Sequence, residues 1–359
     1  MIDYSPVLLS ITSDRDLAQF IDSCKTAPRL TDIYDALASE YFFTTHPKYY
    51  FESDSQKEKR WSSQLSKNPS TNIFSQGSWI YHPWDNNLYH LIDKSEYYGL
   101  RTIRHRNILQ PITQEKLRKA TVAIAGLSVG LNILHAFIRY GIGETYRIAD
   151  PDTFSLSNVN RALYMLDDFG QFKCDVARKV AHQIDPYLHV QTYQEGLDPD
   201  SLPSFLHGAS LIVDAFDRFD MKLALRHEAK KLKIPVLSGF DVEKGVLLIV
   251  ERYDTETHLT TDLFLNHTDE QALTQSTLSP KERTELFITI IGKELHSANM
   301  LKSVRAVGKT LTGYPQLIVA TLAAASCFTL AAEQILDGKS IGSYRSFLPL
   351  SQLIAPPAH

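Results

Sequence analysis

The stretch that decides the fold runs from residue 120 to residue 130 and reads Ala-Thr-Val-Ala-Ile-Ala-Gly-Leu-Ser-Val-Gly. Its first half is a nearly continuous apolar run that predicts a buried strand ending at Gly126. Gly130 opens a segment with helical spacing, so a glycine turn is expected between strand and helix. Such a turn presents backbone N–H groups to a phosphate. A tight turn without a ligand also fits, because Ser128 and Leu131 replace the later glycines of G-x-G-x-x-G.

The alternation of strands and helices continues far along the chain. After the strand at 121–125, strands are expected at residues 145–149, 189–194, 210–214, 236–239 and 245–252. Helices are expected at residues 130–140, 173–184 and 221–231, and two more near 285–294 and 314–336. A polar loop is expected at 254–277, followed by a helix that Ser279 caps. This order predicts an α/β fold with a Rossmann-like, mostly parallel sheet covered by helices on both faces.

Residues 1–100 differ in character and are expected to form a small N-terminal α+β extension. Residues 14–39 have helical spacing, and the polar residues 52–70 predict an exposed loop. Two segments with aromatic alternation, 78–82 and 87–92, predict a hairpin whose aromatic side chains pack together. The expected division of the chain is an extension at 1–100, an α/β domain at 101–345 and a C-terminal tail at 346–359.

Composition argues against several classes of function. The chain of 359 residues has a formal net charge of −4 and no basic run, so no electrostatic argument supports nucleic-acid binding. Three scattered cysteines, Cys24, Cys174 and Cys327, argue against a disulfide framework and against a thiolate zinc site. The long uncharged stretch at 311–332 is rich in Ala and predicts a buried helix rather than a membrane span. A cytoplasmic protein is therefore expected.

Four polar residues then follow at spacings that suit a nucleotide. Asp150 ends the second strand, where a carboxylate can accept from the hydroxyl groups of a ribose. Asn158 and Arg161 share one side of a helical turn and can address one phosphate together, while Lys173 opens the next helix with a second positive charge. A solvated turn and a solvated basic face are the alternatives. The whole set favours a nucleotide whose phosphates react over one that lends a hydride.

Asp217 and two arginines extend this set. Asp214 and Asp217 stand at the end of another strand, and Mg²⁺ takes one or two carboxylates together with phosphate and water. Asp217 is the better candidate because it lies past the strand, with helix capping as its alternative. Arg104 and Arg106 precede the first strand and could reach a phosphate in the same chain or across a dimer, or remain on the surface.

Together these residues resemble the adenylation domain of the ThiF/MoeB/HesA superfamily, the bacterial relatives of ubiquitin-activating enzymes. The resemblance is closest over residues 120–245 and extends more loosely from about residue 100 to residue 336. Order and spacing agree in Val122-Ala-Ile-Ala-Gly-Leu127, Gly141-Ile-Gly143, Asp150-Pro-Asp-Thr-Phe-Ser-Leu-Ser-Asn-Val-Asn-Arg161, Gly170-Gln-Phe-Lys173, Asp185-Pro186, Asp214-Ala-Phe-Asp217 and Ile234-Pro-Val-Leu-Ser-Gly239. Residues 101–345 are therefore expected to be a ThiF-like adenylation domain.

The resemblance implies an ATP- and Mg²⁺-dependent adenylyltransferase that activates a carboxylate, either the C-terminus of a peptide or ubiquitin-like protein or a small molecule. Attack on the α-phosphorus would give an acyl-adenylate and pyrophosphate. The implied residues are Gly126 and Gly130 in the nucleotide turn, Asp150 at the ribose, Asn158, Arg161 and Lys173 at the phosphates, Asp217 at Mg²⁺, and Arg106 or Arg104 at the triphosphate. A homodimer is implied as well, and residues 1–100 would grip a peptide substrate.

The departures from the family pattern concern the cysteines. Many members carry C-x-x-C pairs that bind zinc; these are absent, so no zinc is expected. Cys174 stands beside a helix N-terminus that would lower its pKa, yet no cysteine lies in a loop suited to a transfer nucleophile. The acceptor is then a free amine, a thiol or an external group.

Three alternatives remain. One is a cyclising or dehydrating relative that adenylates a small molecule or a carboxyl group on a modified tRNA base. Another is an NAD-binding Rossmann oxidoreductase, which gives Arg161 and Lys173 no shared task. The third is a catalytically silent ThiF-like scaffold, against which the intact Asp150, Arg161, Lys173 and Asp217 argue.

Overall fold

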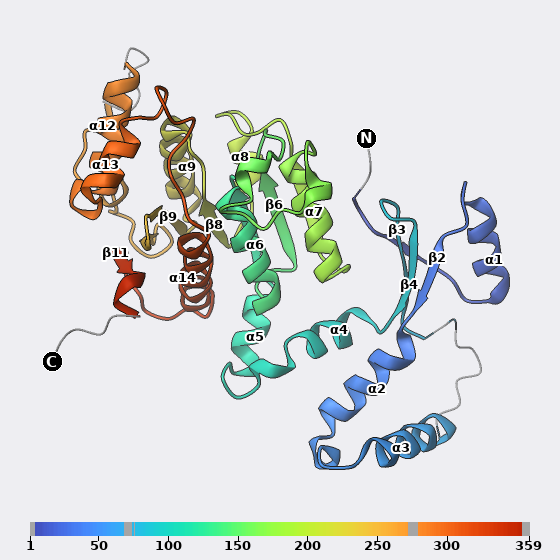
Figure 1. Cartoon of the computed structure of the whole chain (residues 1–359). Coiled ribbons are helices and arrows are strands. Elements are labelled where there is room, and N and C mark those ends of the chain that lie inside the picture. The colour runs from blue at the N-terminus through green and yellow to red at the C-terminus, as the bar shows by residue number, and fades with distance from the viewer. Residues whose placement is uncertain (1–3, 68–73, 75, 272–278, 354–359) are drawn as a thin grey trace. The chain divides into compact units, whose positions relative to one another are not determined.

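The computed structural model describes residues 4–67, 74, 76–271 and 279–353, and the chain divides into two compact units (Figure 1). The first unit comprises residues 1–110 together with residues 182–187. The second comprises residues 111–181 and 188–359. The boundary expected at residue 100 lies ten residues before the end of the first unit's N-terminal stretch at Gln110.

The first unit is built on a four-stranded sheet with the order β1-β3-β4-β2. Its elements are β1 (Val7–Leu9), α1 (Asp14–Ser23), β2 (Arg29–Asp32), α2 (Tyr34–Thr45), α3 (Asp54–Lys67), β3 (Ser78–His82), β4 (Asn87–Leu91) and α4 (Lys94–Arg101). Strands β3 and β4 pair antiparallel and confirm the predicted hairpin. Trp79 stacks on His90 with ring centroids 4.2 Å apart, so the aromatic side chains do pack this small sheet.

Two predictions for this unit were wrong. Residues 14–39 hold two helices separated by β2, rather than one helical segment. Residues 54–67 form α3 where an exposed loop was expected. Ser53 begins this helix, because its backbone N–H donates to Gln56 Oε1 at 2.8 Å and its hydroxyl accepts from the Gln56 N–H. This Ser-x-x-Gln capping box and the helix-forming Lys, Glu and Gln residues outweigh the lack of an apolar face. Residues 68–70 of the expected loop lie outside the described residues.

The second unit is built on a seven-stranded sheet with the order β11-β10-β9-β8-β5-β6-β7. Its strands are β5 (Thr121–Ala125), β6 (Thr145–Ala149), β7 (His189–Tyr193), β8 (Leu211–Asp214), β9 (Val236–Val242), β10 (Gly245–Glu251) and β11 (Tyr344–Pro349). The five neighbouring strands β7, β6, β5, β8 and β9 run parallel to one another. Strand β10 then pairs antiparallel with β9, and β11 pairs antiparallel with β10 at the edge of the sheet. This arrangement confirms the predicted Rossmann-like, mostly parallel sheet.

Helices cover both faces of this sheet (Figure 1). They are α5 (Pro111–Arg118), α6 (Val129–Tyr140), α7 (Lys173–Ile184), α8 (Leu202–Leu206), α9 (Phe219–Leu232), α10 (Asp262–Leu265), α12 (Pro280–Ile291), α13 (Ala298–Val304) and α14 (Ile318–Leu336). Helix α14 packs against α6, β9 and β10. On the other face, Phe205 of α8 and Leu225 of α9 share a core with Ala123 and Ile212 of the sheet.

Helix α14 is the core helix that the uncharged stretch predicted, and it begins later than expected. It is the one helix within the described ranges that is long and apolar enough to cross a membrane. Ten of its 19 residues, including Phe328 and Ile335, are nevertheless buried within the unit. The helix starts at Ile318 instead of residue 314. Pro315 disfavours a helical conformation of the residue before it, and residues 312–316 are not helical.

Other segments of this unit differ from expectation at the edge of the sheet. The predicted loop at 254–277 contains α10, whose Phe264 and Leu265 are buried; residues 272–277 lie outside the described part. The predicted Ser279 cap is confirmed, since the Ser279 N–H donates to Glu282 Oε2 at 2.7 Å. Strand β11 was not predicted; it supplies the outer edge of the sheet by pairing with β10.

Candidate functional site

The carboxyl ends of the parallel strands border one cavity of the second unit. Ala125 of β5 pairs with Ala149 of β6 and with Asp214 of β8, so these three strands end at the same level. The cavity there has a volume of about 1350 Å³. A site for one small molecule typically has roughly 300–1000 Å³. The cavity is therefore larger than a typical site for one small molecule.

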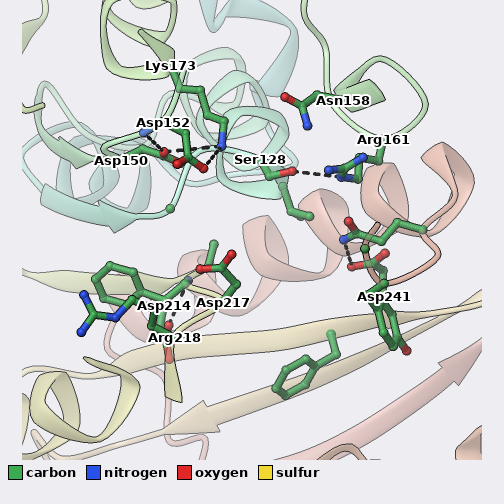
Figure 2. Close-up of a pocket in the computed structure, with 18 of the residues that line it drawn as sticks. Ser128, Asp150, Asp152, Asn158, Arg161, Lys173, Asp214, Asp217, Arg218 and Asp241 are labelled. Atoms are coloured by element: carbon green, nitrogen blue, oxygen red, sulfur yellow. Dashed lines mark hydrogen bonds and ion pairs between the residues drawn. The ribbon is translucent and has the colours of Figure 1, made fainter. Parts of the chain in front are cut away.

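Most of the residues selected from the sequence line this cavity. They are Gly126, Asp150, Asn158, Arg161, Lys173 and Asp217. Figure 2 shows them arriving from different elements: Lys173 and Asp150 gather on one side, Arg161 on another and Asp217 on a third. The structure thus brings together side chains that are spread over ninety residues of sequence.

The turn after β5 requires Gly126. Its φ of +94° lies in the region that other residues rarely adopt, and an added Cβ would stand 2.3 Å from the Ala215 carbonyl oxygen. Gly130 has a different role from the one implied, because it is not among the residues that line the cavity. A Cβ on Gly130 would meet the Ile124 side chain at 3.0 Å, so this glycine allows α6 to pack closely on β5.

Asp150 and Lys173 form a tight polar cluster with Asp152. One oxygen of Asp150 accepts from the Leu127 N–H at 2.7 Å, and the other accepts from the Asp152 N–H at 2.9 Å. Lys173 Nζ lies 2.7 Å from Asp152 Oδ2 and 3.5 Å from Asp150 Oδ1. Burial raises the pKa of Asp150, an effect that Lys173 and the Leu127 N–H oppose. Asp150 therefore fixes the glycine turn, and Lys173 carries a charge that an entering phosphate would share with the exposed Asp152.

Arg161 and Asn158 lie in the segment between β6 and α7. Asn158 Oδ1 accepts from the Ser155 N–H at 3.1 Å, which closes a short helical turn. Arg161 Nε donates to Ser128 Oγ at 3.3 Å, and its Nη1 donates to the Ser157 carbonyl at 2.7 Å. Within the described ranges, Asn158 Nδ2 and Arg161 Nη2 have no hydrogen-bond partner, so both donors remain for a ligand in the cavity.

The two acids after β8 have separate roles. Asp214 is fully buried and pairs with Lys222 at 2.9 Å and with Arg226 at 2.6 Å. Burial alone would raise the pKa of Asp214, but Lys222 and Arg226 hold it below its usual value. Asp217 is exposed and lines the cavity. Of the two carboxylates, Asp217 is the one without an ion pair that buries it, and its role toward a cation stays a prediction.

A metal at this position would need ligands from the nucleotide. Among the described residues, no group of three or more His, Cys, Asp or Glu side chains could hold a metal ion by itself. Magnesium commonly binds one or two carboxylates and completes its shell with phosphate oxygens and water. The exposed carboxylate of Asp217 fits that arrangement.

The remaining predicted residues lie elsewhere. Arg104 and Arg106 are exposed in the first unit and are not among the residues that line the cavity. The expectation that a helix N-terminus lowers the pKa of Cys174 was wrong, because burial raises it to about 12. Its Sγ lies 3.4 Å from the Asp150 carbonyl oxygen, within the core. Cys174 is therefore a packing residue.

Sequence reasoning missed the far side of the cavity. Phe240 and Asp241 of β9 line it, together with residues 312–316. Gln316 Nε2 donates to Asp241 Oδ1 at 3.0 Å, and the Gln316 carbonyl accepts from Asn160 Nδ2 at 2.8 Å. Asp241 is the one charged residue of β9, and this was a usable signal for it. Nothing in the sequence pattern marked Gln316, because its partners lie 75 and 156 residues away.

Comparison with known proteins agrees with this geometry. The model of the ThiF family matches residues 100–336, about two thirds of the chain. The chain belongs to the ThiF family. The match begins in the first unit and ends with the last residue of α14, so it contains every residue of the cavity.

Curated relatives of this ThiF-family chain include three kinds of protein. An uncharacterised protein of Mycobacterium tuberculosis is 29% identical over 79% of this chain, which spans only 39% of that relative's length. The molybdopterin-synthase adenylyltransferase of Haemophilus influenzae is 26% identical over 56% of this chain and 81% of its own. The tRNA threonylcarbamoyladenosine dehydratase of Bacillus subtilis is 27% identical over 49% of this chain and 68% of its own.

Solved structures support the fold. PaaA superimposes with a TM-score of 0.52 at 21% identity, over 71% of this chain and 79% of that one. The E. coli tRNA N6-threonylcarbamoyladenosine dehydratase, solved in complex with AMP, gives a TM-score of 0.50 at 18% identity, over 68% of this chain and 97% of that one.

Proposed function

We propose that this protein is an ATP-dependent adenylyltransferase that activates a carboxylate as an acyl-adenylate and releases pyrophosphate. One observation carries the proposal: the donors of Asn158, Arg161 and Lys173 and the carboxylate of Asp217 line a single cavity at the glycine turn. A hydride-transferring enzyme has no use for this set. Chemistry at phosphorus does, because it depends on holding the phosphate oxygens and offsetting the charge that develops on them.

Each residue has a task in this proposal. The turn at Gly126 receives the nucleotide, and Asp150, which holds that turn, faces the ribose. Asn158 Nδ2 and Arg161 Nη2 donate to phosphate oxygens. Lys173 breaks its ion pair with Asp152 and donates to a phosphate oxygen as well. A carboxylate oxygen of the substrate attacks the α-phosphorus, a P–O bond forms, and the bond to the leaving pyrophosphate breaks. Arg106 or Arg104 is proposed to reach the triphosphate.

Asp217 would hold Mg²⁺ together with the phosphates. Bound there, the ion would neutralise charge on the triphosphate and on the departing pyrophosphate. Within the described residues no group of three or more metal-ligating side chains is present, so binding of the ion is expected to depend on the nucleotide. No zinc is part of the proposal.

The carboxylate substrate is proposed to be a peptide or small-protein C-terminus, or a small molecule. Support comes from relatives whose names describe adenylyl transfer to a molybdopterin synthase and dehydration of a tRNA nucleoside. The cavity volume, which exceeds that of a single small-molecule site, supports a second substrate beside the nucleotide. With three free thiols, Cys24, Cys174 and Cys327, the proposed location is the cytoplasm.

Nucleotide binding by calorimetry tests the proposal and separates it from the NAD-linked alternative. The wild-type protein is expected to bind ATP with Mg²⁺ and to show no comparable affinity for NAD. Arg161→Ala and Lys173→Ala should each weaken ATP binding about tenfold or more, since each removes a charge-assisted contact. Melting temperatures of both variants control for folding. Tighter binding of NAD than of ATP, or unchanged ATP affinity in both folded variants, would refute the proposal.

A further inference from the structure

Asp241 is a buried carboxylate that none of the nucleotide-binding tasks requires. It stands in β9 opposite Val246 of β10, only 8% exposed, and it lines the cavity. Figure 2 shows its side chain on the side of Arg161, apart from Lys173 and Asp150. An acid at a buried strand position is costly unless something compensates it.

Only one of the two carboxylate oxygens of Asp241 has a hydrogen-bond partner among the described residues. Oδ1 accepts from Gln316 Nε2 at 3.0 Å. Oδ2 is buried and has no hydrogen-bond partner in the part of the chain that the structure describes. Buried polar atoms are satisfied in the great majority of cases, so a partner from outside the protein is expected for Oδ2.

Gln316 fixes the carboxylate with respect to the nucleotide-binding segment. Its side chain holds Asp241, and its carbonyl accepts from Asn160, the neighbour of Arg161 in sequence. The positive charge of Arg161 acts on the Asp241 carboxyl and lowers its pKa, against the larger effect of burial. Asp241 thus stands within electrostatic range of the group proposed to bind phosphate, without an ion pair to it.

The charge of Asp241 restricts which carboxylates can react nearby. A second carboxylate brought toward the phosphates would be repelled by it. A substrate that carries an N–H donor next to its carboxyl group turns this repulsion into an attraction, because a charged acceptor makes a strong hydrogen bond. The same donor would satisfy the unpartnered Oδ2.

We propose that Asp241 is the specificity-determining residue of the acyl subsite, where its Oδ2 accepts a hydrogen bond from an ammonium or amide N–H on the carbon next to the activated carboxyl group. This inference rests on the proposed adenylyltransferase function. It narrows the substrate class to amino acids and to the C-terminal residue of peptides, and it disfavours simple fatty or keto acids.

Stable acyl-adenylate mimics test the inference without knowledge of the natural substrate. The probes are adenosines with a 5′-O-acylsulfamoyl group, used as two pairs: in one pair an ammonium group is replaced by methyl, and in the other an amide N–H is replaced by methylene. Glycyl is compared with propionyl, and N-acetylglycyl with 4-oxopentanoyl. Affinities are measured by calorimetry for the wild type, Asp241→Leu, which removes the acceptor, and Asp241→Asn, which keeps its shape but not its charge.

The wild type is expected to prefer the N–H member of at least one pair by about tenfold or more. Asp241→Leu should lose that preference for both pairs, and Asp241→Asn should lose it for the glycyl pair. Asp217→Asn is the matched control: it removes another carboxylate of the same cavity, and the preference should stay. The melting temperature of each variant verifies the fold.

The outcomes separate the two proposals. If all four mimics bind and the wild type does not prefer the N–H member of either pair, the inference fails while the adenylyltransferase assignment stands. The same holds if the wild type has this preference and Asp241→Leu retains it. If no mimic binds to the wild type, the assignment itself fails and the inference with it. If Asp241→Leu weakens ATP binding only when Mg²⁺ is present, Asp241 serves a metal ion instead, which also overturns the inference.

Discussion

At the scale of single residues, the buried carboxylate of Asp241 has a free-energy cost that its neighbours offset only in part. Burial raises its pKa from 3.8 to about 6, although the hydrogen bond from Gln316, a backbone N–H and the charge of Arg161 all lower it. The folded protein therefore holds this proton up to a higher pH than the unfolded chain. The contribution of this carboxyl group to the free energy of unfolding therefore falls as pH rises from about 4 to 6.

Asp241→Asn is accordingly expected to stabilise the protein at pH 7.5. The difference between the two pKa values corresponds to at most about 3 kcal/mol above pH 6 and should vanish below pH 4. Urea unfolding of wild type and variant at several pH values measures it. A variant that is less stable than the wild type at pH 7.5 would show that the carboxylate is already compensated within the fold.

The residues that could be predicted are those whose role follows from local position. Asp150 directly follows β6, Lys173 begins α7, and Asp217 lies in the short loop between β8 and α9, so the sequence pattern alone places them at the ligand edge of the sheet. Asp241 and Gln316 could not be paired in this way. Their hydrogen bond depends on how residues 312–316 return to the sheet, which no local pattern encodes.

At the scale of elements, a buried ionic network joins β8, α9 and β10 beneath the cavity. Asp214 of β8 binds Lys222 and Arg226 of α9, and Arg226 also pairs with Glu251 of β10 at 2.8 Å. All four side chains are at most 2% exposed. The network fixes the start of α9 relative to the strand and so positions the intervening loop with Asp217.

The two acids of this loop provide a matched pair of variants. Asp214→Asn leaves Lys222 and Arg226 without their full counter-charge and is expected to destabilise the fold by about 3–5 kcal/mol. Asp217→Asn changes an exposed residue and should alter stability by less than about 0.5 kcal/mol while it weakens Mg²⁺-dependent ATP binding. Chemical denaturation and calorimetry give both quantities. Equal stability of the two variants would contradict the structural role of Asp214.

At the scale of the whole molecule, one segment next to the cavity exposes many apolar side chains. Leu156, Val159, Met165, Leu166 and Phe169 are all exposed between β6 and α7. Apolar side chains gathered in this way commonly mark a protein interface. We therefore propose a homodimer that uses this segment, in agreement with the expectation from the sequence.

Sedimentation velocity tests the dimer. Leu166→Asp, at a side chain that is 85% exposed, is expected to shift the protein from dimer to monomer. Phe51→Asp is the control, since Phe51 is 94% exposed in the first unit and should leave the mass unchanged. A wild-type protein that sediments as a 40.6 kDa monomer at micromolar concentration would rule the proposal out.

The fold was predictable in the part of the chain where the hydrophobic periodicity identifies each strand and helix and where these elements alternate in sequence. Alternating strands and helices allow few arrangements other than a parallel sheet covered on both faces, and the second unit has that arrangement. The first unit was less predictable: α3 has almost no apolar face, and β2 lies within a stretch that has helical spacing. Edge strand β11 is stabilised by its pairing with β10 rather than by a pattern of its own.

The central claim is that one cavity binds a triphosphate and a divalent ion together. A crystal structure with ATP and Mg²⁺ tests it most directly. We predict phosphate oxygens within hydrogen-bond distance of Asn158, Arg161 and Lys173, with the ion between them and Asp217. A triphosphate bound outside this cavity, or inside it without contact to Arg161 and Lys173, would contradict the account.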